Sequence, residues 1–266
     1  MFASAVTTER AHSQQVFAAV DDLVAESAVD YAAAQPTLSE ANFVSGLDQN
    51  GLQLWDAAFA SLEQYAQHVA ALASPDLSKD LEEESVRLGG ELQSLGSKLQ
   101  REGINSEAPR FNPTLAAGIT ELGSLIIRLK AQADTRRATQ EGDPYVRKVF
   151  LEMAASIGDS SAEGVRGTVK THWNTLLAQK KAEFLEAKNA SERREIAASF
   201  QTMLKRRTAQ DSILASLHQS LTTLADLHHA LAKADAVSVH RFLDTLVGEM
   251  NRTTQLKQQF QPQSKP

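Results

Sequence analysis

Cysteine is absent from this chain of 266 residues, which excludes disulfide bonds, thiolate metal ligands and cysteine nucleophiles. A protein without cysteine is stable in either redox environment, so the absence does not decide the compartment. Long apolar runs are absent too: the triplet at residues 125–127 ends at Arg128, far short of the roughly 18 apolar residues that a membrane-spanning helix needs. We therefore expect a soluble protein.

The first ten residues lack a basic segment followed by an apolar core, so the sequence as given begins without a signal peptide. We expect a cytoplasmic protein if the sequence is complete. If an N-terminal signal or lipid-anchor segment has been trimmed, we expect the cell envelope instead, with the protein either periplasmic or lipid-anchored.

Strand signals are also missing, because no alternation of β-branched and polar residues is flanked by turn pairs such as Asn-Gly. Proline is rare, and all seven prolines fall where the apolar pattern breaks, as helices require, since an internal proline removes a hydrogen bond. Between these breaks, apolar residues recur in alternating steps of three and four, which is typical of helices packed lengthwise. The sequence predicts an all-α protein.

The predicted architecture is an antiparallel up-and-down bundle of about seven helices with mostly short connections. We expect the helices over residues 7–34, 51–73, 77–102, 114–139, 144–188, 191–235 and 236–260, with Gly103 capping the third. Gly142, Asp143 and Pro144 are interpreted as the stop of the fourth helix and the start of the fifth. Asp235 is the expected N-cap of the last helix.

Residues 144–188 and 191–235 are expected to pair as a long helical hairpin. The second arm contains neither glycine nor proline and would serve as the spine of the bundle. In the first arm we expect a kink or break near Gly158, followed by a capping box in which Ser160 and Glu163 bond each other's backbone. Ser191 is the expected N-cap of the spine.

The whole chain, 1–266, is expected to form a single elongated domain, with a possible subdivision into parts 1–103 and 113–260 at the loop between them. The charges are unevenly divided: residues 1–110 contain 17 acidic and 6 basic side chains, whereas residues 111–266 contain 16 and 21. Either the two parts attract each other, or the basic part binds an anionic partner. The excess of basic side chains in residues 111–266 is small for a nucleic-acid-binding protein, so we do not expect nucleic acid as a partner.

Motifs that indicate catalysis or metal binding are missing: the sequence contains no G-x-S-x-G, H-E-x-x-H or G-x-G-x-x-G. His218, His229 and His240 are 11 residues apart, about 16 Å along a straight helix, too far to share a metal. Asp226 and His229 could ligate together, but the paired Glu-x-x-His motifs of a di-metal bundle are missing. We expect no catalytic residues, metal site or cofactor.

The feature that stands out is a cluster of basic residues around the predicted turn of the hairpin. Its eight members are accompanied by four glutamates, which leaves an excess of four positive charges that could contact an acidic partner or anionic lipid head groups. Ion pairing on a solvated helix face is the alternative interpretation. The predicted interaction surface consists of Lys180, Lys181, Lys188, Arg193, Arg194, Lys205, Arg206 and Arg207.

The leading functional hypothesis is a non-enzymatic helical bundle that acts through its surfaces as a scaffold, adaptor or cell-envelope module, with an unidentified protein as partner. One alternative is a peripheral protein that binds anionic membrane surfaces or acidic partners through the basic hairpin tip. A second is a bundle that binds a ligand or cofactor internally. The oligomeric state is open, because the same apolar seams could be covered within one chain or between two.

Overall fold

A computed structural model describes residues 1–33, 35, 37–43, 47–72, 80–102, 109–129 and 135–260. This part of the chain forms eight α-helices and one 3-10 helix and contains no strand, which confirms the all-α prediction. The elements are α1 (Phe2–Ala33), η1 (Glu40–Phe43), α2 (Gln49–Ala71), α3 (Asp80–Glu102), α4 (Pro113–Leu129), α5 (Thr135–Ile157), α6 (Gly164–Glu186), α7 (Ala190–Ala232) and α8 (Ala236–Phe260).

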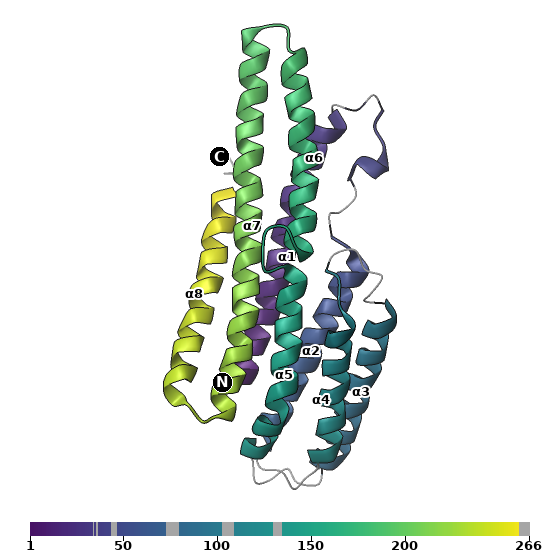
Figure 1. The fold of residues 1–266 in the computed structure, drawn as a ribbon, viewed down its shortest axis with the longest axis vertical. Coiled ribbons are helices and arrows are strands. Elements are labelled where there is room, and N and C mark those ends of the chain that lie inside the picture. The colour runs from purple at the N-terminus through teal and green to yellow at the C-terminus, as the bar shows by residue number, and fades with distance from the viewer. Residues whose placement is uncertain are drawn as a thin grey trace.

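The helices lie side by side in an up-and-down bundle, as predicted (Figure 1). Its spine is α7, whose 43 residues span about 65 Å at roughly 1.5 Å per residue. Helices α5 and α6 follow each other along α7 and form the other arm of the predicted hairpin. Helices α1 and α8 also contact α7, whereas α3 and α4 pack on each other and reach the rest of the bundle through α2 and α5.

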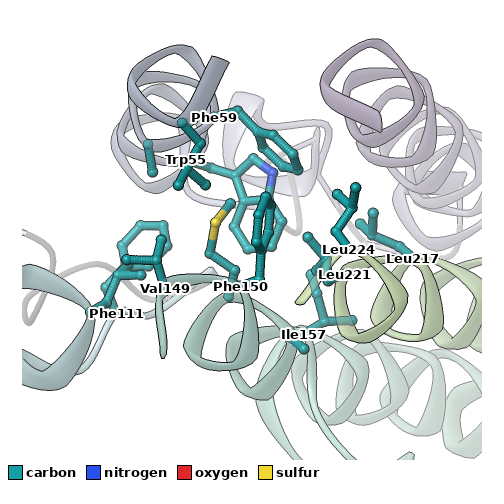
Figure 2. Close-up of a cluster of buried hydrophobic side chains, with 14 of the residues drawn as sticks. Trp55, Phe59, Phe111, Val149, Phe150, Ile157, Leu217, Leu221 and Leu224 are labelled. Carbon is teal, nitrogen blue, oxygen red and sulfur yellow. The ribbon is translucent and has the colours of Figure 1, made fainter. Parts of the chain in front are cut away.

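Large side chains from helices far apart in the sequence fill the core. Figure 2 shows Trp55 and Phe59 of α2 near Phe150 of α5, with Leu217 and Leu221 of α7 in the same cluster. The rings of Phe59 and Phe150 meet edge to face at 6.3 Å, and burying one such side chain contributes about 1.5–3 kcal/mol. The buried side chains form one cluster with members from all eight α-helices. The subdivision of the chain at residues 103–113 stays a prediction.

The predicted break near Gly158 is confirmed. Gly158 has a positive φ of 112°, which favours glycine, and α5 ends at the preceding residue, so one arm of the hairpin is two helices. The capping box is wrong: α6 begins after Glu163, whose side chain makes no capping hydrogen bond. The physical reason is that the Ser160 hydroxyl accepts from the backbone of Ala162 (3.4 Å) in a local turn.

The predicted boundary at residues 141–144 is also wrong, because α5 begins at Thr135 and passes through Pro144. Glycine is needed at position 142 for packing: a Cβ there would lie 2.1 Å from the hydroxyl of Tyr65. Asp143 is needed as a partner of His228 rather than as a helix cap (Oδ1–Nδ1 3.1 Å). Residues typical of a helix boundary are therefore used for contacts inside a helix.

Other predicted boundaries shift by a few residues. The first helix begins at Phe2 instead of residue 7, and the second at Gln49 instead of residue 51. Asp235 is confirmed as the cap of α8, since its Oδ1 accepts from the backbone N–H of Ser238 (3.1 Å). The expected cap at Gly103, the continuation of the fourth helix over residues 130–134 and the ends at residues 73 and 77 lie outside the described residues.

Candidate interaction surface

The turn of the hairpin is closed by reciprocal capping between Asn189 and Glu192. The Asn189 side chain accepts from the backbone N–H of Glu192 (3.0 Å), and the Glu192 carboxylate accepts from the backbone N–H of Lys188 (2.8 Å). Asn189, with extended backbone angles, is the N-cap of α7 in place of the predicted Ser191. One N-terminal donor of α7 and one donor of the turn are satisfied in this way, which gives the hairpin a defined end.

The end of the hairpin projects beyond the bundle and stands above every other helix in Figure 1. The last buried residue of α6 is Leu177 and the first of α7 is Met203. The segment between them, residues 178–202, is here called the hairpin tip, and it includes roughly 20 Å of α7 at about 1.5 Å per residue. Every residue of the tip is exposed or only partly buried, so its side chains are available to a partner.

One face of the tip has an apolar hollow of about 450 Å³. Its wall combines aromatic and aliphatic side chains from both helices, with two lysines at the rim: Lys180, Lys181, Phe184, Leu185, Ile196, Ala197 and Phe200. Leu185 is 80% exposed and Phe184 is 38% exposed. Large apolar side chains gathered in an exposed hollow are typical of an interaction site.

Cationic side chains hold the aromatic rings of this hollow in place. Lys181 lies over the ring of Phe200, with Nζ 5.8 Å from the ring centroid, and Arg193 lies over Phe184 at the same distance. Each cation–π contact at an exposed site is worth about 0.5–1 kcal/mol. Lys180 donates to Glu183 (2.9 Å) and is largely buried. The hollow is thus partly preformed before any partner arrives.

The four glutamates of the tip line a second, separate hollow of about 340 Å³. Its wall is formed by Glu183, Glu186, Ala187, Glu192, Glu195 and Ile196. The outermost residues, 183–195, contain four acidic and three basic side chains. The end of the rod is therefore mixed in charge, although the predicted cluster as a whole is basic.

The structure distributes the eight predicted basic residues over two places. Lys180, Lys181 and Arg193 border the apolar hollow, and Lys188 and Arg194 are exposed near the turn. Lys205, Arg206 and Arg207 lie along α7 below the tip, about 22 Å or more from Ala190, the first residue of that helix, at roughly 1.5 Å per residue. Arg207 donates to Asn174 across the hairpin (3.0 Å). These residues do not form one continuous patch.

A buried polar cluster joins α2, α5 and α7. Asp143 accepts from His228 (3.1 Å) and from His229 (2.6 Å), and Tyr65 lies 3.3 Å from the other ring nitrogen of His228. Burial lowers the pKa of His228, against the opposing effect of Asp143. Burial acts to raise the pKa of Asp143, but the hydrogen bonds from the two histidines outweigh it, so that pKa is lowered. No cavity adjoins this cluster among the described hollows, and its geometry indicates helix alignment.

A second buried cluster, on α1, was missed in the sequence. Glu9 and His12 are almost fully buried and bond each other (2.9 Å), and burial raises the pKa of Glu9. Among the described residues, Glu9 Oε2 and His12 Nε2 have no hydrogen-bond partner. The signal that could have found them is the apolar stripe of α1, because His12 and Glu9 continue it backwards from Val16 in steps of four and three.

Over the residues that the structure describes, no group of three or more histidine, aspartate or glutamate side chains could hold a metal ion. In the same part of the chain, no helix is long and apolar enough to span a bilayer.

The geometry defines a class of protein: an all-helical bundle from which one long hairpin projects. Comparison with family models, curated proteins and solved structures found no match for this chain.

Proposed function

We propose that this protein is a non-enzymatic interaction module, a scaffold, adaptor or cell-envelope component, and that it binds a protein partner through the hairpin tip. The observation that supports this proposal is the apolar hollow on the projecting tip, in which Leu185 remains 80% exposed. Exposing Leu185 and Phe184 at the end of a rod costs hydrophobic free energy that a partner would recover.

The chemistry of the hollow favours an amphipathic helix that carries carboxylates. Phe184 and Phe200 offer an apolar floor of the kind into which such a helix places residues spaced three and four apart. Lys180, Lys181 and Arg193 border that floor and would attract acidic side chains on the flank of the partner. Aromatic and arginine side chains are also the residue types that most often dominate binding energy at interfaces.

An anionic membrane surface is the second candidate, favoured by the exposure of Leu185 together with the neighbouring cations. Four glutamates among residues 183–195 oppose it, because they would approach the same head groups as the basic side chains. A protein partner can instead place its charges where each side chain of the tip requires them. The mixed charge of the tip therefore supports the protein partner.

The test measures binding of two synthetic amphipathic peptides of about 18 residues, long enough for several helical turns, by fluorescence anisotropy. Both have the same apolar face, flanked in one by glutamates and in the other by lysines. We expect saturable binding of the acidic peptide and binding weaker by at least about ten-fold for the basic one. Leu185→Glu should weaken the affinity for the acidic peptide by about ten-fold or more, since it removes roughly 1.5–3 kcal/mol of apolar burial.

The matched control is Val237→Glu on α8, because Val237 is 82% exposed and Leu185 is 80% exposed. It should leave the affinity unchanged. Equal binding of both peptides, or an equal loss in both variants, would contradict the proposal. Salt-sensitive sedimentation with phosphatidylserine vesicles that Leu185→Glu abolishes, without any peptide preference, would assign the tip to a membrane instead.

A further inference from the structure

A second site lies at the elbow between α5 and α6, below the tip. A short loop joins the two helices there, and Gly158 and Gly164 at its ends both have positive φ values, of 112° and 55°. Arg166 fixes the elbow by donating to the carbonyl of Gly158 (3.3 Å) and, through two nitrogens, to Asp211 of α7 (2.8 and 3.1 Å). The bidentate pair attaches the elbow to the spine and makes its shape rigid.

A hollow of about 230 Å³ opens beside this elbow. Polar and charged side chains from the elbow, α6 and α7 form its wall, together with one valine: Ser161, Arg166, Val169, Lys170, Arg207, Thr208 and Asp211. The charge of Asp211 is compensated by Arg166, whose side chain is only 12% exposed. Lys170 and Arg207 remain as two positive charges that face the hollow, and neither forms an ion pair with another residue in the described part of the chain.

The hydrogen-bond donors of this hollow exceed its acceptors. Lys170 donates one N–H to Ser161 Oγ (3.0 Å), which leaves two ammonium hydrogens and the Ser161 hydroxyl hydrogen free to donate elsewhere. Arg207 donates from Nη1 to the amide oxygen of Asn174 and has four further N–H groups. A ligand that supplies only acceptor oxygens and negative charge would satisfy all of these donors.

We propose that the elbow hollow binds a phosphate group, either free or carried by a small molecule. The oxygens of the group would accept from Lys170, Ser161 and Arg207, while the Arg166–Asp211 pair keeps the elbow in shape. The site goes beyond the proposed function of the tip, because Lys170 lies about 22 Å from Leu185 along α6 at roughly 1.5 Å per residue.

The experiment titrates inorganic phosphate, and in a second arm glycerol phosphate, into the full chain at low ionic strength, with binding followed by calorimetry and by ³¹P NMR. We expect saturation by phosphate. Lys170→Met and Arg207→Met should each weaken the affinity for phosphate by about ten-fold or more, because each removes a charge-assisted hydrogen bond.

The control is Lys98→Met, since Lys98 is an exposed lysine outside the hollow that pairs with Glu102. This variant should leave phosphate binding unchanged. Leu185→Glu at the tip should leave it unchanged too, and this result would show that the phosphate site and the tip are independent. Circular dichroism confirms that each variant is folded. A specific site should saturate below about 20 mM phosphate, which already corresponds to weak affinity. Failure to saturate by that concentration would overturn the proposal, and so would an equal loss of phosphate binding in Lys98→Met. Tighter binding of glycerol phosphate than of phosphate would identify a phosphate ester as the ligand class.

Discussion

At the scale of single residues, the polar side chains inside the bundle tie helices together. Gln210 of α7 is fully buried, accepts from the indole N–H of Trp173 on α6, and donates to the backbone carbonyl of Val20 on α1 (2.7 Å). One amide thus bonds two neighbouring helices. Gln210 lies on the apolar seam of α7, seven residues after Met203 and four before Leu214, and its contacts fix the register of the three helices.

Gln210→Leu should destabilise the protein by about 2–4 kcal/mol, because it leaves a buried donor and a buried acceptor unpaired, at roughly 1–3 kcal/mol each. Urea unfolding measures the loss. Gln219→Leu on the exposed face of the same helix is the matched control and should change stability by less than about 0.5 kcal/mol. Similar effects of the two substitutions would show that the buried bonds contribute nothing.

The buried histidine of the α2–α5–α7 cluster predicts a pH dependence of stability. In the unfolded chain His228 titrates near its ordinary pKa of about 6.5, whereas burial lowers the pKa of folded His228. Its contribution is therefore fully present above pH ~6.5 and is lost as the pH falls toward the folded pKa. Glu9 acts in the opposite sense, because burial raises the pKa of that carboxyl.

A comparison of wild type with His228→Gln isolates the histidine from Glu9, which both proteins share. Between pH 7.5 and 5.5, wild type should lose about 1 kcal/mol more of its free energy of unfolding than the variant does. Urea titrations at several pH values measure the two slopes. Parallel pH profiles would mean that folded His228 protonates as readily as it does in the unfolded chain.

At the scale of helices, we expect alanine to have opposite effects on stability at Gly158, in the elbow, and at Gly248, inside α8. Gly158→Ala should cost about 2 kcal/mol or more, because the positive φ disfavours alanine and the new Cβ would lie 2.1 Å from the carbonyl oxygen of Glu163. Gly248→Ala in α8 meets no atom within 4 Å and should gain about 0.5–1 kcal/mol from helix propensity. Thermal unfolding compares the two, and a destabilised Gly248→Ala would contradict this account of the helices.

The helices were predictable because the apolar residues that recur in steps of three and four are the same residues that fill the core. Steps of three and four residues placed Leu214, Leu217, Leu221 and Leu224 on one line, and all four are fully buried. Helix boundaries were less predictable, since Gly-Asp-Pro at 142–144 is typical of a helix start yet lies within α5. The contacts of those residues with Tyr65 and His228 come from helices distant in the sequence, which local pattern does not reveal.

At the scale of the whole molecule, the position of the candidate surface was predictable but its composition was not. Charge counting along the chain identified the end of the hairpin, where Lys180 and Lys181 border a hollow. The same counting combined them with Arg207, which bonds Asn174 well below the tip. Which side chains share a face depends on helix phase and on the register of α6 against α7, and neither follows from counting charges along the chain.

The central claim is that the protein acts through the hairpin tip. Its most direct test is a hydrogen-exchange map of the full chain with and without the acidic amphipathic peptide. Because none of residues 178–202 is buried, we expect their amides to exchange faster than those of the core in the free protein. The peptide should slow exchange within that segment and leave α2, α5 and α8 unchanged. Protection confined to another surface, or no protection at saturating peptide, would contradict the claim.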